Sequence, residues 1–117
     1  MGTRLNSMAA ECHQIARNHG FWPAPSYVAL SGLTSDGADH NVPMKLSLIH
    51  SEISEALEEY RVARSEAESV EKLGNELVDA IIRILDLACY LGIDLDRTYA
   101  SITEANSHRP MLHNKRF

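Results

Sequence analysis

The spacing of apolar residues constrains the fold of this 117-residue chain more than any other feature. Over residues 70–91, apolar side chains recur every three or four positions and cover most of the circumference of a helix. Three more segments show helical spacing: one that ends at Gly20, one that begins near Pro43 and one that Asp94 or Asp96 can cap. No segment alternates at period two. The chain is therefore predicted to be all-α, a four-helix-type bundle.

Two connecting segments are predicted between these helices. Residues 21–42 contain prolines and glycines without periodicity, and an irregular stretch longer than about 15 residues in a compact domain is usually functional or disordered. We expect a functional role for this long loop, in which Trp22 is a candidate for stacking on a base. The charged segment 64–70 is predicted to be the turn of a helical hairpin.

Composition limits the class of protein. The chain has 44% apolar residues and a net charge of −5, which fit a single globular domain over residues 1–117. An acidic surface disfavours binding to nucleic acid or to an anionic membrane, and no long apolar run or signal peptide is found, so a cytoplasmic protein is expected. The helix at 70–91 is apolar over more of its surface than one thin bundle covers, which predicts a homo-oligomer, a dimer or a tetramer, formed through helices.

Two acidic pairs are the main candidates for chemistry. Glu52-x-x-Glu55 and Glu76-x-x-Asp79 each place two carboxylates on neighbouring positions of one helix face. In an antiparallel hairpin the pairs can converge, and a cation would then offset their repulsion; oxygen ligands favour Mg²⁺ or Mn²⁺. No Glu-x-x-His or His-Glu-x-x-His motif supports a di-iron or zinc site. Solvated acids on a non-enzymatic helical dimerisation module remain the alternative from another class.

Three stretches carry a resemblance to a known family: residues 45–58, KLSLIHSEISEALE, residues 76–87, ELVDAIIRILDL, and residues 106–115, NSHRPMLHNK. The first two resemble the two metal-binding motifs of the MazG-like all-α nucleoside triphosphate pyrophosphohydrolases, which are related to the dimeric dUTPases. The third resembles a C-terminal motif of small members of that superfamily. The resemblance covers about residues 43–117.

This resemblance implies an oligomeric helical bundle that hydrolyses (deoxy)nucleoside triphosphates to monophosphate and pyrophosphate, with nucleotide pool sanitation as one use. A dUTP- or phosphoribosyl-ATP-specific hydrolase of the same superfamily is the alternative. A carboxylate that the metal leaves free, Glu55 or Glu76, is expected to accept the proton of the attacking water. The expected Mg²⁺ or Mn²⁺ ligands are Glu52, Glu55, Glu76 and Asp79, and the expected substrate-binding residues are Arg109, Asn106, Lys115, Lys45 and Trp22.

Overall fold

The computed structural model describes residues 4–22 and 38–110, with side chains of the second range from residue 42 onward. Within these ranges the chain is entirely helical and contains no strand, which confirms the all-α prediction. The four helices are α1 (Leu5–Asn18), α2 (Ala38–Val62), α3 (Glu66–Tyr90) and α4 (Leu95–Ser107). No described helix combines the length and the apolar character needed to cross a bilayer.

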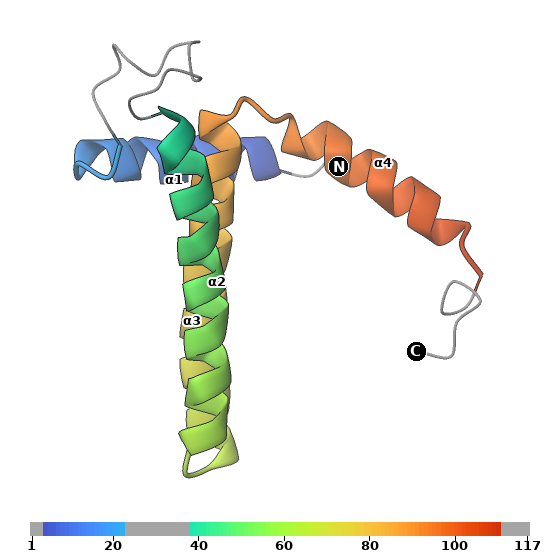
Figure 1. The fold of residues 1–117 in the computed structure, drawn as a ribbon. Coiled ribbons are helices and arrows are strands. Elements are labelled where there is room, and N and C mark those ends of the chain that lie inside the picture. The colour runs from blue at the N-terminus through green and yellow to red at the C-terminus, as the bar shows by residue number, and fades with distance from the viewer. Residues whose placement is uncertain (1–3, 23–37, 111–117) are drawn as a thin grey trace.

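The centre of the fold is a long antiparallel hairpin of α2 and α3 (Figure 1). Helix α1 crosses one end of this hairpin and packs extensively on α3. Helix α4 extends away from the hairpin and makes a small contact with α1 (Figure 1). The contacts that position a site between helices are therefore those among α1, α2 and α3.

The hairpin turn is shorter than the predicted break at 64–70. Ser65 caps α3 by accepting a 3.1 Å hydrogen bond from the Glu68 amide, and the Glu68 carboxylate accepts from the Arg64 amide at 3.0 Å. This reciprocal capping satisfies amides that have no partner within a helix. Glu66 and Glu68 are also favoured in a first turn by the helix dipole. The charged residues that suggested a break therefore begin α3 instead.

The prediction that the second helix begins near Pro43 is wrong at its start, because α2 begins at Ala38 and contains Pro43. A proline has a φ angle that fits a helix, and near the N-terminus it removes few intrahelical hydrogen bonds. The helix can therefore extend ahead of it. The predicted irregular loop 21–42 is thus helical from residue 38, and its part at 23–37 lies outside the described residues.

Both predicted glycine stops are confirmed. Gly20 has φ +80° just after α1, and Gly92 has φ +71° just after α3. A left-handed residue at this position is favourable for glycine, which has no Cβ to clash. The chain can therefore reverse at these two points at little cost.

The N-termini of α1 and α4 cap each other. Asp96 accepts a 2.8 Å hydrogen bond from the Leu5 amide at the start of α1. In return, the side chain of Asn6 accepts from the Leu95 amide at 2.7 Å and donates to Asp94 at 2.9 Å. Asp94 also accepts from the Arg97 amide, which confirms Asp94 as the N-cap of α4. These bonds join the first and last helices across about ninety residues of chain.

The core formed by the described residues is small. Many large apolar side chains of α2 and α3 are more than 40% exposed, including Ile53, Leu57, Leu77 and Ile81. The buried apolar residues among those described are Ala9, Trp22, Ala56, Ala80, Leu85, Leu87 and Ala88. One chain therefore leaves much of the apolar surface of its hairpin uncovered.

The capping role of Asp94 predicts a specific pH dependence. Its hydrogen bonds with Asn6 and with the Arg97 amide hold the pKa of Asp94 below the usual value of 3.8. The unfolded chain therefore takes up this proton first, and folding stability is lost as the pH falls below about 4. Asp94→Asn keeps the cap acceptor but does not titrate. We expect the melting temperature, followed by circular dichroism, to fall less steeply with acid in this variant; parallel curves would contradict the assignment.

Candidate active site

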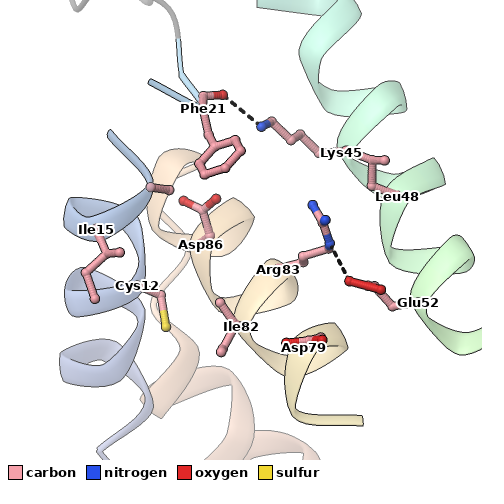
Figure 2. Close-up of a pocket in the computed structure, with 11 residues that line it drawn as sticks. Cys12, Ile15, Phe21, Lys45, Leu48, Glu52, Asp79, Ile82, Arg83 and Asp86 are labelled. Carbon is pink, nitrogen blue, oxygen red and sulfur yellow. Dashed lines mark hydrogen bonds and ion pairs between the residues drawn. The ribbon is translucent and has the colours of Figure 1, made fainter. Parts of the chain in front are cut away.

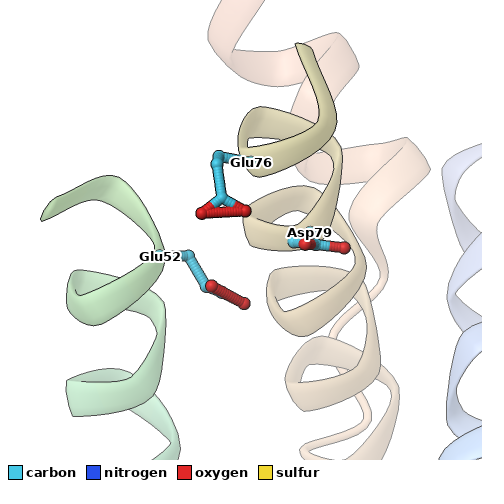
Figure 3. A group of neighbouring side chains, drawn as sticks. All are labelled: Glu52, Glu76 and Asp79. Atoms are coloured by element: carbon cyan, nitrogen blue, oxygen red, sulfur yellow. The ribbon is translucent and has the colours of Figure 1, made fainter. Parts of the chain in front are cut away.

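Three of the four predicted metal ligands lie together between α2 and α3. Glu52 projects from α2 toward Glu76 and Asp79 on α3 (Figure 3). One carboxylate oxygen of each residue lies within 4.8 Å of the other two. Such a group can share one cation, and its oxygen donors suit a hard ion such as Mg²⁺ or Mn²⁺.

Small residues flank this group along each helix. Ala56 is 3% exposed and follows Glu52 by one turn, and Ala80 is 2% exposed and follows Glu76 by one turn. Small buried side chains allow neighbouring helices to approach closely. Glu52 itself is 8% exposed, although glutamate is seldom buried without a partner. The sequence therefore places a charged group inside the contact between the two helices.

Glu55, the fourth predicted ligand, is exposed and is not one of the three residues whose carboxylate oxygens all lie within 4.8 Å of one another. It nevertheless acts on Glu76, whose pKa is raised by partial loss of hydration, by the charge and a hydrogen bond of Glu55, and by the charges of Glu52 and Asp79. The charges of Glu55, Glu52 and Asp79 raise this pKa through repulsion among like charges. A bound cation would relieve this repulsion, so the residues present fit a divalent ion.

A pocket of about 410 Å³ lies beside these carboxylates, between α1, α2 and α3 (Figure 2). Its wall is formed by charged groups from the two hairpin helices and by apolar groups from all three helices and the segment that follows α1. The apolar lining includes Ile15, Phe21, Leu48 and Ile82, and the charged lining consists of Lys45, Glu52, Asp79, Arg83 and Asp86. A cavity of this size and mixed character is typical of a small-molecule site.

The two cations of the pocket have different surroundings. Arg83 donates from Nε to Glu52 Oε2 at 2.9 Å. Lys45 donates to the Phe21 carbonyl at 2.9 Å and lies 4.3 Å from the centre of the Trp22 ring. Burial and the nearby Arg83 charge lower the pKa of Lys45, whereas Asp86 acts in the opposite direction. The two positive groups are therefore close enough to repel each other across the pocket.

Asp86 fixes the end of the pocket that is opposite Asp79 along α3. Its buried carboxylate accepts from Trp22 Nε1 at 2.8 and 3.0 Å and from His13 Nδ1 at 2.8 Å. Trp22 stacks on Tyr90 with ring centres 4.2 Å apart, and Lys45 Nζ also lies over the Trp22 ring. Trp22, a candidate for stacking on a base, is buried in the structure and packs against Tyr90, His13 and Lys45.

Sequence reasoning missed the link between His13 and Asp86. The available signal was Asp86 as the single charged residue in the last two turns of α3, residues 84–90, where an unpaired carboxylate would be costly. Its partners lie 64 and 73 residues away, so spacing along the chain could not identify them.

The remaining predicted substrate contacts lie away from this pocket. Asn106 is exposed on α4, which leads away from the hairpin, and Arg109 follows that helix (Figure 1). Neither residue lines the pocket, and Lys115 lies outside the described residues. Lys45 is the expected substrate-binding residue that the structure places on the pocket wall.

Comparison of the chain with protein-family profiles, curated proteins and solved structures gave no match. The site is therefore interpreted from its geometry and from the motif resemblance. The geometry adds one fact to that resemblance: residues from both acidic motifs meet beside a pocket that contains two cations.

Proposed function

We propose that this protein is a Mg²⁺-dependent nucleoside triphosphate pyrophosphohydrolase, which releases monophosphate and pyrophosphate. The observation that carries the proposal is the convergence of Glu52 with Glu76 and Asp79, because these residues belong to the two motifs that resemble the MazG-like enzymes. A chance arrangement of solvated acids would not require a buried glutamate at the centre of the helix contact.

Electrostatics supports a substrate that arrives with a cation. A triphosphate carries about four negative charges, and a pocket lined by three carboxylates would repel it if it came alone. A bound Mg²⁺ ion would supply the positive charge that offsets the carboxylates and the triphosphate, and would make the attacking water more acidic. The residues that would hold it are Glu52, Glu76 and Asp79, with Glu55 adjacent to Glu76.

The chain's own residues can then be given roles. A carboxylate oxygen of Glu76 or Glu55 that the cation leaves free accepts the proton of the attacking water. Water adds to the α phosphorus, the bond from that phosphorus to the bridging oxygen breaks, and pyrophosphate leaves with the electron pair. Lys45 and Arg83 lie on the pocket wall, where positive charge would favour phosphate. The apolar wall near Phe21 and Ile15 can exclude water from the nucleoside.

We also propose that the enzyme is a homo-oligomer, in which a second copy covers the exposed side of the hairpin. Helix α2 and helix α3 each carry one row of large apolar side chains, spaced four and then three residues apart. The side chains of these two rows are 43–63% exposed. Contiguous apolar surface of this kind is typical of an interface. The rows are Ile53, Leu57 and Tyr60 on α2, and Leu77, Ile81 and Ile84 on α3. An oligomer would also allow α4 and Arg109 to reach the site of another copy.

The metal site can be tested by amide substitution. Glu76→Gln and Asp79→Asn keep the volume of each side chain and remove the charge that attracts a cation. In the unchanged protein we expect added Mg²⁺ to raise the free energy of unfolding by about 1.4 kcal/mol at tenfold the dissociation constant, and activity to depend on it. Both effects should be lost in the two variants. The control is Glu71→Gln, an exposed glutamate on α3 outside the site; full activity in both site variants would refute the assignment.

The reaction products distinguish this proposal from an ordinary phosphatase. Attack at the α phosphorus yields monophosphate and pyrophosphate in equal amounts, with no diphosphate intermediate. In water enriched in the heavy oxygen isotope, the label should enter the monophosphate, and mass spectrometry can locate it. The canonical deoxynucleoside triphosphates and several damaged ones should be screened. Label in the pyrophosphate would show that the cleavage position is wrong even where the metal site is right.

The oligomer is tested by mass in solution. We expect light scattering at micromolar concentration to give a multiple of 13.0 kDa. Leu57→Glu and Ile81→Glu should each lower this mass, because a charge in an apolar interface is costly. Arg61→Glu, on the exposed end of α2, is the control. A monomeric mass for the unchanged protein would refute the interface.

A non-enzymatic dimerisation module is the competing function, and the exposed apolar rows favour it as much as they favour an oligomeric enzyme. The effect of Mg²⁺ on stability and on pyrophosphate release distinguishes the enzyme from the dimerisation module. A module whose acids are merely solvated would keep its mass and stability unchanged by Mg²⁺ and would release no pyrophosphate.

A further inference from the structure

The Arg83–Glu52 ion pair joins two side chains of very different solvent exposure. The Glu52 side chain is 10% exposed, whereas the Arg83 side chain is 41% exposed. A buried carboxylate needs a positive partner, because an unpaired charge in this position is strongly destabilising. Glu52 is thus fixed within the helix contact, and Arg83 is the member of the pair that can move.

This ion pair competes with the proposed metal. Glu52 Oε2 accepts the hydrogen bond from Arg83, and Glu52 is also one of the three residues whose oxygens can share a cation. A guanidinium and a divalent ion close to one carboxylate repel each other. Binding of one therefore weakens the hold of the carboxylate on the other.

The orientation of Arg83 gives its guanidinium a second use. The bond to Glu52 is made by Nε, and the two terminal nitrogens point away from Glu52, toward the part of the pocket near Lys45 (Figure 2). A guanidinium presents its donors as a planar fork that matches phosphate oxygens. An anion located here would also reduce the repulsion between Arg83 and Lys45.

We propose that Arg83 is an exchangeable phosphate-binding residue: it holds Glu52 in the absence of substrate, then gives up this carboxylate to the cation and turns its guanidinium to the triphosphate beside Lys45. The inference rests on the proposed function and concerns regulation of the same site. It explains how a site with a buried glutamate stays folded without a divalent ion. It also explains why an arginine on the α3 face that carries Asp79 and Asp86 points into the pocket.

The test measures two ligands separately and needs no turnover. Mn²⁺ alone is titrated by electron paramagnetic resonance, and tripolyphosphate, which carries the substrate's phosphates without a base, is titrated by calorimetry in Mg²⁺. Arg83→Ala should bind Mn²⁺ more tightly by about threefold or more, because a competitor for Glu52 is gone. It should bind tripolyphosphate more weakly by about tenfold or more, because a charge-assisted contact is lost.

Two further variants make the result specific. Arg83→Lys keeps a positive charge but lacks the fork, so its tripolyphosphate affinity should fall between those of the unchanged protein and Arg83→Ala. Arg61→Ala removes the same kind of residue from an exposed site on α2 and should leave both affinities within about twofold. Circular dichroism of each variant confirms that it is folded.

The possible failures can be told apart. If the unchanged protein binds no Mn²⁺, the proposed metal site fails, and the exchange fails with it. If Mn²⁺ binds and Glu76→Gln abolishes that binding, the metal site stands. In that case, an Arg83→Ala variant that weakens both ligands shows a purely structural ion pair. An unchanged affinity for either ligand also overturns the exchange.

Discussion

The contact between α2 and α3 is organised around a charge that is costly to bury. Glu52 lies within this contact at 8% exposure, and Glu76 and Asp79 bring two more carboxylates within 4.8 Å. Their repulsion favours separation of the helices, while Ala56 and Ala80 and the apolar contacts around them favour close approach. In the structure, the positive charge of Arg83 offsets the cost of burying Glu52 in this contact.

Local features of the sequence predicted local structure well. Gly20 and Gly92 end helices because each adopts a left-handed conformation next to the last turn, and Asp94 caps α4 through its own side chain. These outcomes depend on residues only a few positions apart. The start of α2 was predicted less well, because Pro43 is compatible with both the first turn and a later position in a helix, and the sequence alone does not choose between them.

The site was predictable only as far as helical spacing determines it. A separation of three places Glu76 and Asp79 on one face, and the hairpin brings Glu52 to them. The same spacing rule predicted Glu52 and Glu55 equally as metal ligands. In the structure, the rotation of α2 about its axis buries Glu52 and exposes Glu55. That rotation is set by packing along the whole helix. The contacts of Trp22 could not be predicted from spacing either, because its partners Asp86 and Tyr90 are more than sixty residues away along the chain.

The two buried acids of the pocket differ in what holds them. Asp86 accepts hydrogen bonds from Trp22 and His13, and both of these side chains are packed against Tyr90. Removing those donors would require α1 and the segment after it to leave the hairpin. Glu52 depends on one half-exposed arginine, which can be replaced without moving a helix. Asp86 therefore acts as a fixed part of the wall, and Glu52 as the carboxylate whose partner can change, which is the property that a metal ligand needs.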